Sequence, residues 1–340
     1  MGEFELLARV RERLPAGGPR LRVGSGDDAA VTVPGGATAT SVDALVDGVH
    51  FRREVASPRQ IGHKALATAL SDLAAMGAEP GEAYVVLGVP ADLDEDECLA
   101  LLDGMLDIAR STGTDVAGGD VTRSKELFLA LTVVGHAAHP DDLVGRGGAR
   151  PGDALVLTGE IGAAGAGLVL LQNQDLSADP AFSAPIEGTN DGSTNEMGAA
   201  LLSRQLEPRP RLAAGRALAV AGATAMIDVS DGLGADARHL AMQSGVRLRI
   251  QAEAVLLAAG VREVASLAER DPWRFALGGG EDYELLATLP AKRIEEAKRA
   301  VREAEGIELT AIGEAVAGEG VEIRLPGGEV LEPEGFDQLD

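Results

Sequence analysis

Hydrophobic and polar residues alternate in blocks along the first 140 residues, and these blocks predict strands and helices in turn. The expected strands cover residues 38–42, 83–89 and 127–134, and the expected helices cover residues 58–77 and 94–112. Pro58 suits the first position of a helix, and Gly77 suits the position after its last turn. In the second helix Leu99, Leu102 and Leu106 form an apolar stripe, and acidic residues crowd the first turn.

The pattern changes after residue 140, where residues 141–153 are dense in glycine, proline and charge. Such a segment predicts a domain boundary, so we expect domains over residues 1–140 and 141–340. The second part predicts strands over 154–158, 224–228, 246–250, 284–289 and 321–324, and helices over 162–171, 208–221, 232–243 and 291–305. Residues 172–199 are rich in Asn, Ser, Asp and Gly, which predicts a flexible surface loop.

Length and charge narrow the class of protein. The chain has 340 residues, more than one hydrophobic core comfortably holds. Acidic residues number 54 and basic residues 30, giving a net charge of -24, which argues against non-specific binding of nucleic acid. No apolar stretch approaches the ~20 residues of a membrane span, and nothing resembles a signal peptide. A single cysteine, Cys98, excludes an internal disulfide framework, so we expect a cytoplasmic protein.

Two common catalytic signatures are missing from the sequence. None of its lysines stands in a G-x-x-x-x-G-K-[ST] motif, which excludes a P-loop nucleotide binder. Its five histidines include no H-E-x-x-H pair, which makes a zinc protease a poor interpretation.

Acidic residues instead recur in glycine- or serine-rich motifs, which we interpret as turns. They are Asp27, Asp28, Asp43, Asp47, Asp72, Asp120, Asp228, Asp231, Glu281 and Asp282. Any one aspartate beside a glycine is commonly a turn or a helix cap. Asp72 differs because it stands inside an apolar helical run, where a carboxylate needs a partner or a metal ion.

Several carboxylates that converged in one cleft would repel one another and raise one another's pKa. A divalent cation removes that conflict, and ligands that are all oxygen select a hard ion such as Mg²⁺. Glycine beside an acid lets the backbone and the carboxylate come close to a ligand. The motifs therefore predict a magnesium-dependent site.

The same motifs carry a family resemblance. They include GSGDDAA (24–30), SVDALVDGVHF (41–51), KALATALSDLAAMGAEP (64–80), GGDVTRS (118–124), MIDVSDGL (226–233) and GGGEDYELL (278–286). With the terminal GFD (335–337), the chain resembles the thiamine-monophosphate kinases along nearly its whole length. This family lies in an ATP-binding superfamily with aminoimidazole ribonucleotide synthase, selenophosphate synthetase and a hydrogenase-maturation protein. The resemblance implies a two-domain α/β plus α+β fold, whose N-terminal domain forms the dimer sheet or barrel and whose C-terminal domain closes the active site.

The resemblance also implies an activity, the ATP-dependent phosphorylation of thiamine monophosphate to thiamine diphosphate by direct in-line transfer with Mg²⁺. The acceptor is a phosphate monoester with a second pKa near 6, so its attacking oxygen is largely deprotonated at neutral pH. No general base is therefore expected. The difficulty is to bring two polyanions together, and with so few lysines the metal ions supply most of the positive charge.

Particular roles follow from the resemblance alone. It implies Mg²⁺ ligands at Asp27, Ser41, Asp43, Asp72, Asp120, Asp228 and Asp231, of which Asp72, Asp120 and Asp228 are the most critical. It implies nucleotide contacts at Gly119, Asp120, Arg146 and Ser230, and contacts to thiamine phosphate at His50, Glu281 and Phe336, the last by stacking. It leaves open whether Asp28, Asp47 and Asp282 bind metal. Leu102 stands where the family commonly has a tyrosine near the nucleotide.

Alternative interpretations remain at this stage. A sister enzyme, such as the aminoimidazole ribonucleotide cyclo-ligase, would keep the fold and change the acceptor. Selenophosphate synthesis is disfavoured, because it needs a reactive cysteine near the N-terminus and Cys98 stands in a predicted helix. A non-catalytic nucleotide or metal sensor would need fewer acidic motifs. A merely salt-adapted acidic protein would scatter its acids over exposed helix faces. The partners we expect are ATP, thiamine monophosphate and a second copy of the chain.

Overall fold

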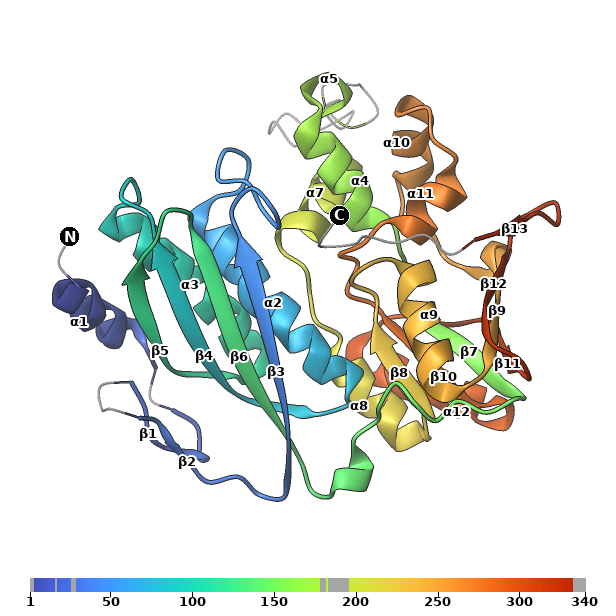
Figure 1. The fold of residues 1–340 in the computed structure, drawn as a ribbon, viewed down its shortest axis with the longest axis horizontal. Coiled ribbons are helices and arrows are strands. Elements are labelled where there is room, and N and C mark those ends of the chain that lie inside the picture. The colour runs from blue at the N-terminus through green and yellow to red at the C-terminus, as the bar shows by residue number, and fades with distance from the viewer. Residues whose placement is uncertain (1–2, 16, 26–28, 178–181, 183–195, 333–340) are drawn as a thin grey trace. The chain divides into compact units, whose positions relative to one another are not determined.

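The computed structural model describes residues 3–15, 17–25, 29–177, 182 and 196–332. The chain divides into two compact units, each with its own sheet (Figure 1). Unit 1 comprises Met1–Ala74 and Ala78–Leu143, and unit 2 comprises Ala75–Gly77 and Val144–Asp340. The change of unit after Leu143 falls within the glycine- and proline-rich segment 141–153.

Unit 1 is built on a four-stranded sheet with two helices on one face (Figure 1). In spatial order its strands are β3 (Ala37–Val46), β6 (Phe128–Ala137), β4 (Glu79–Val89) and β5 (Asp115–Arg123). Only β4 and β5 pair in parallel, and α3 (Glu95–Thr112) connects them. The other covering helix is α2 (Pro58–Ala75). A short helix, α1 (Glu3–Arg13), and a ribbon of β1 (Leu21–Val23) and β2 (Val31–Thr32) complete the described part.

Two glycines let α2 and α3 pack backbone against backbone. A Cβ atom on Gly62 would lie 1.9 Å from the carbonyl oxygen of Leu101, and one on Gly104 would lie 1.8 Å from that of Arg59. At the start of α3, Asp94 caps the helix through a capping box with Glu97. The buried face of α3 also holds Cys98, which is 2% exposed. These contacts fix the layer of helices over the sheet.

Unit 2 is built on a seven-stranded sheet in the order β13-β12-β9-β11-β7-β10-β8. The strands are β7 (Asp153–Thr158), β8 (Ala225–Asp228), β9 (Arg247–Gln251), β10 (Leu285–Pro290), β11 (Leu309–Val316), β12 (Gly320–Arg324) and β13 (Val330–Leu331). All neighbours pair antiparallel except β9 and β12. Helix α9 (Leu233–Ser244) packs on the sheet, and its Leu240 joins a fully buried core with Leu155 and Ile250.

A second group of helices in unit 2 has its own core. It contains α4 (Ala163–Gln172), α7 (Glu196–Leu206), α10 (Val261–Leu267) and α11 (Pro272–Gly278), with Leu201 and Phe275 among the buried side chains. Helices α8 (Leu212–Ala221) and α12 (Ile294–Glu305) pack on each other. The remaining helical turns are α5 (Gln174–Ser177), η1 (Pro140–Asp142), η2 (Ala252–Ala254) and η3 (Ala291–Arg293). No helix among the described residues has the length and apolar character needed to cross a membrane.

Each helix and strand predicted from the sequence lies in the structure within a few residues of its expected bounds. The elements that the pattern missed include α1, β1, β2, β5, α7, α10, α11, β11 and β13. The loop predicted over 172–199 is wrong at its ends, because residues 174–177 form α5 and α7 begins at Glu196. Most of its middle lies outside the described residues, although Phe182 is buried in the second core.

Candidate active site

Unit 1 brings three of the predicted residues together on the helix-covered face of its sheet. Ser41 and Asp43 alternate along β3, and Asp43 pairs with the fully buried Leu131 of β6. Asp72 on α2 accepts a hydrogen bond of 2.5 Å at Oδ2 from Ser41 Oγ. Ser41 stands in the strand predicted over 38–42, which in the structure extends to Val46, so the interpretation of Asp43 as a turn residue is wrong.

Asp120 lies on the opposite face of the same sheet. On β5 it pairs with Val86 of β4. Val86 pairs with Ala130 of β6, and Ala130 pairs with Ala44 of β3, the residue next to Asp43. Paired residues share a face, so Asp120 is directed away from Asp43. It also stands in β5 rather than in the predicted turn. Among the described residues, the structure therefore does not bring Asp120 together with Ser41, Asp43 or Asp72.

The glycine before Asp120 is required by the sheet. A Cβ atom on Gly119 would lie 2.0 Å from the carbonyl oxygen of Val85 on β4. Any side chain there would force the two parallel strands apart, so the motif that we expected to approach a nucleotide also has a structural reason. Leu102, the predicted departure from the family pattern, is buried in α3 at 5% exposure.

His50 follows β3 and is held through its ring. Its Nδ1 accepts a hydrogen bond of 3.1 Å from the backbone N–H of Val46. In the neutral ring the proton is then on Nε2, which makes that atom a donor. Lys64 is 3% exposed and donates to the carbonyl oxygen of His50 at 3.4 Å. Asp47 accepts from the N–H of Arg53 at 3.4 Å, a weak contact that stabilises the same turn. Asp27, Asp28 and Phe336 lie outside the described residues.

Unit 2 gathers a second acidic set at the end of β8. Asp228 ends the strand at 4% exposure, and Ser230 and Asp231 follow in the turn before α9. The carboxylate of Asp236, on the first turn of α9, accepts N–H groups from Ser230 and Asp231 at 3.0 and 3.1 Å. Burial, followed by the charges of Asp228 and Asp231, raises the pKa of Asp236 to about 8. Negative charge is thus concentrated in this turn.

Glu281 belongs to the same group through its backbone. The N–H of Glu281 donates to the carbonyl oxygen of Ser230 at 2.7 Å. The N–H of Tyr283 donates to the carbonyl oxygen of Val229 at 2.9 Å. Both Glu281 and Tyr283 have positive φ, 67° and 51°, which costs energy for residues other than glycine. The Glu281 carboxylate accepts a hydrogen bond of 2.6 Å from Nε2 of Gln205 on α7. Strain of this kind is commonly found where a side chain must be aimed.

The next two acidic residues are structural. Asp282 is 3% exposed and accepts N–H groups from Gly162 and Ala164 at the start of α4, at 2.8 and 3.3 Å. Burial raises its pKa to about 7, while these N–H groups lower it. Glu284, fully buried, accepts from Arg204 at 2.7 Å, from Arg211 at 2.9 Å and from the Thr158 hydroxyl at 2.7 Å. These contacts tie α7 and the start of α8 to the sheet.

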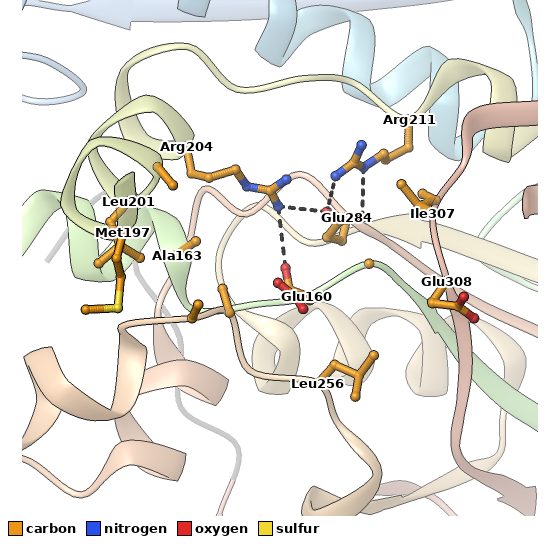
Figure 2. A pocket seen from close by; sticks show the side chains of 14 residues that line it. Glu160, Ala163, Met197, Leu201, Arg204, Arg211, Leu256, Glu284, Ile307 and Glu308 are labelled. Atoms are coloured by element: carbon orange, nitrogen blue, oxygen red, sulfur yellow. Dashed lines mark hydrogen bonds and ion pairs between the residues drawn. The ribbon is translucent and has the colours of Figure 1, made fainter. Parts of the chain in front are cut away.

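Arg204, Arg211 and Glu284 also line a cavity of about 390 Å³ within unit 2 (Figure 2). Its other walls are mainly apolar side chains, among them Leu201 and Leu256. Figure 2 shows two guanidinium groups reaching Glu284, that of Arg204 from α7 and that of Arg211 from the residue before α8, and Arg204 also donates to the carbonyl oxygen of Glu160.

Sequence reasoning missed the cavity residues, and it missed Asp236 and Gln205 as well. Asp236 had a usable signal, since an acid in the first turn of a helix after Ser-Asp-Gly can accept the turn's N–H groups. Gln205 had none, because only the fold brings it to Glu281.

Arg146, the predicted phosphate contact, is exposed and belongs to unit 2. Its carbonyl oxygen accepts from the Ser244 hydroxyl at 3.1 Å, and that of Gly145 accepts from the N–H of Met226 at 3.0 Å. The segment therefore runs along β8, the strand that ends at Asp228. Arg146 and the acidic set of unit 2 thus share one edge of the sheet.

The oxygen donors suit a hard cation better than a soft one. Over the described ranges, no three His, Cys, Asp or Glu side chains are grouped closely enough to hold an ion by themselves. Mg²⁺ does not require such a cage, since it is commonly bound by one or two carboxylates together with water and substrate phosphates. In unit 2, Asp228 and Asp231 lie close enough to Asp236 that their charges add to the effect of burial in raising its pKa, so three carboxyl groups stand near one another there. The donor chemistry therefore fits Mg²⁺.

Comparison with known proteins identifies the class. The AIR synthase related protein N-terminal domain matches residues 26–137, and the corresponding C-terminal domain matches residues 150–326. The chain belongs to the AIR synthase related family and, within it, to the thiamine-monophosphate kinases. The relative from Mycobacterium tuberculosis (strain CDC 1551 / Oshkosh) is 37% identical over 84% of this chain and 80% of its own. That from Aquifex aeolicus (strain VF5) is 30% identical over 99% of this chain and 97% of its own.

Solved structures agree in fold. Thiamine-monophosphate kinase from Stenotrophomonas maltophilia K279a aligns with a TM-score of 0.79 at 33% identity, covering 97% of this chain and 98% of the other. A structure of AaThiL complexed with AMPPCP and TMP aligns with a TM-score of 0.74 at 29% identity, covering 98% and 96%. Hydrogenase maturation protein HypE, at 20% identity and a TM-score of 0.71 over 100% and 98%, shares the fold. The expected family and its two-domain fold are confirmed.

Proposed function

We propose that this chain transfers the γ-phosphoryl group of ATP to thiamine monophosphate, giving thiamine diphosphate and ADP. The observation that carries the proposal is similarity to thiamine-monophosphate kinases over 84–99% of the chain. Among the acidic residues that the structure describes in these motifs, Asp228 is buried, Asp43, Asp72 and Asp231 are partly buried, and Asp120 is exposed. The related AaThiL, solved with AMPPCP and TMP, holds an ATP analogue and such an acceptor.

The chemistry needs no general base from the chain. The acceptor phosphate is already largely deprotonated at neutral pH, so the task is to align its oxygen with the γ-phosphorus. His50, with a donor at Nε2, is suited to a phosphate oxygen of the acceptor. Arg146, exposed beside β8, is suited to clamp a phosphate of the nucleotide.

Mg²⁺ would be held in two places. In unit 1 the ligands would be Ser41, Asp43 and Asp72, and in unit 2 they would be Asp228 and Asp231. When bound, Mg²⁺ neutralises phosphate charge and lets two polyanions approach. Asp27 remains a predicted ligand by resemblance. Asp120, on the other face of the sheet, we assign with Gly119 and Ser230 to nucleotide binding, and Glu281 and Phe336 to the acceptor.

We also propose a homodimer formed through the open face of the unit 1 sheet. Val42 on that face is 70% exposed and Val86 is 37% exposed, and apolar residues on a sheet face favour burial against a partner. Domains over 1–140 and 141–340, closure of the second over the active site, and a cytoplasmic location complete the proposal. Size-exclusion chromatography of the protein and of a Val42→Asp variant tests the dimer.

The decisive experiment incubates the purified protein with ATP, Mg²⁺ and thiamine monophosphate and measures ADP and thiamine diphosphate. We expect both products in equal amounts, and no reaction after removal of Mg²⁺ with EDTA. Turnover of another acceptor of the superfamily, with none of thiamine monophosphate, would overturn the assignment in favour of a sister enzyme.

A further inference from the structure

The last turn of α7 contacts the strained segment 281–284 at two carboxylates. Arg204 donates to Glu284 at 2.7 Å, and its neighbour Gln205 donates from Nε2 to Oε2 of Glu281 at 2.6 Å. Gln205 is 4% exposed and Glu281 is partly exposed, so this second hydrogen bond is shielded from water on its donor side. One helix turn therefore reaches both ends of the segment.

The backbone of Glu281 is fixed independently of Gln205. Its N–H is bonded to Ser230, the carboxylate of Asp282 is bonded to the start of α4, and Glu284 is bonded to two arginines. The Glu281 side chain, by contrast, has three rotatable bonds between that fixed backbone and its carboxylate. The bond from Gln205 acts on the carboxylate itself, so it restricts rotation that the backbone contacts leave open.

The two carboxylates receive different kinds of partner on this turn. Glu284 meets arginines, whose positive charge compensates its own. The Gln205 amide is uncharged, so it orients the Glu281 carboxylate without compensating its charge. A carboxylate held in one orientation suits a cationic ligand. Thiamine monophosphate has such a cation in its thiazolium ring.

We propose that Gln205 is a positioning residue, which holds the Glu281 carboxylate in the orientation that binds the cationic organic part of the acceptor. The inference rests on the proposed function, because it takes the acceptor to be thiamine monophosphate. It adds a residue from a helix in which the sequence motifs placed no part of the site. Gln205 acts through Glu281 and does not itself touch the reacting phosphates.

The test is Gln205→Met, which keeps the volume of the side chain and removes the donor. We expect the KM for thiamine monophosphate to rise about tenfold, while kcat and the KM for ATP change less than twofold, the pattern of lost uniform binding. In a Glu281→Gln background, the same Gln205→Met change is expected to alter that KM less than twofold, because the carboxylate it positions is absent.

Two variants on the same helix serve as controls. Ser203→Ala changes an exposed position, and Leu201→Val loosens the packing of α7 without touching Glu281. Both are expected to leave the KM for thiamine monophosphate within twofold of wild type. If Gln205→Met does not fold, Gln205→Asn replaces it, because its amide is one methylene too short to reach Glu281 and the same KM rise is expected.

Three results would overturn the inference. The first is an unchanged KM for thiamine monophosphate in the folded Gln205 variant. The second is an equal rise of that KM when the same change is made in the Glu281→Gln background. The third is a parallel rise of the KM for ATP, which would indicate a general structural effect. Lack of turnover by the wild-type protein would instead refute the proposed function, and the inference with it. The wild-type measurement therefore separates the two failures.

Discussion

The acidic residues of the candidate site in unit 1 and the buried acidic residues of unit 2 are held in different ways. In unit 1, Asp43 and Asp72 are partly exposed and lie on the surfaces of a regular strand and a regular helix. In unit 2, Asp236, Asp282 and Glu284 are between 0% and 3% exposed and are bonded to backbone N–H groups or arginines. The unit 1 carboxylates contribute little to the stability of the fold, whereas the unit 2 carboxylates stabilise it through their bonded partners.

This difference separates function from stability. A partly exposed carboxylate loses little hydration on folding, so its removal is expected to leave stability nearly unchanged. A buried carboxylate with bonded partners leaves those partners unsatisfied when it is removed. Substitutions of Asp43 and Asp72 should therefore report on chemistry, and those of Asp236, Asp282 and Glu284 on folding as well.

The largest effect is expected at Glu284. Glu284→Ala leaves Arg211, of which 9% of the side chain is exposed, and Arg204 without their carboxylate, so the free energy of unfolding should fall by about 3–5 kcal/mol. Urea denaturation measures the loss. Glu295→Ala is the matched control, because that side chain is 85% exposed and pairs only at the surface with Lys298. A loss below about 1 kcal/mol for Glu284→Ala would contradict the structural view of this cluster.

The next effect is expected on activity alone, at Asp72 in unit 1. Asp72→Asn should lower kcat at least about 100-fold, while Tm changes by no more than about 2 °C. Steady-state kinetics and thermal unfolding measure the two quantities on one preparation. Asp96→Asn, at a position whose side chain is 89% exposed on α3, should leave both unchanged. Near-normal kcat in Asp72→Asn would remove that residue from the site.

A pH dependence is expected from Asp282. Its pKa is about 7 in the folded protein, against 3.8 for an unperturbed aspartate, so the folded state binds the proton more tightly than the unfolded chain does. Its contribution to stability is therefore full below about pH 4 and is lost as the pH rises towards 7. Asp282→Asn cannot ionise, so the free energy of unfolding should fall less over that pH range than in wild type. Parallel pH profiles for the two proteins would show that Asp282 is not the group responsible.

The smallest effect is expected at the cap of α3 in unit 1. Asp94→Ala removes the acceptor for the N–H of Glu97, at 2.9 Å, and should cost about 1 kcal/mol of stability with kcat unchanged. Denaturation and kinetics test both halves of the statement. Asp92→Ala, next to the helix and 72% exposed, should cost less than half as much. A large fall in kcat for Asp94→Ala would mean that α3 is coupled to the chemistry.

The sequence was sufficient where the information is local. The acidic first turn of α3, the burial of Leu99, and the position of Asp72 within a helix all follow from residues within one or two turns, and the structure has all three. The family and fold were likewise carried by motifs in order along the chain.

Pairing between distant strands was not available from the sequence. The interpretation of Asp43 and Asp120 as turn residues failed because glycine and serine near an acid resemble a turn signal. Here Gly119 instead allows close strand pairing, and Ser41 donates to Asp72. Which face Asp120 occupies depends on the register of four strands. The contact of Gln205 with Glu281 joins residues 76 positions apart, so no local pattern could show it.

The single cysteine makes the opening of the helix layer of unit 1 measurable. Burial, together with the neighbouring acids of α3, raises the pKa of the Cys98 thiol to about 11, and the side chain is 2% exposed. Thiol reagents react with the thiolate, so the native protein should resist maleimide or iodoacetamide near neutral pH. Labelling would then proceed only through molecules in which α3 has opened, and its rate would count such openings without any engineered probe.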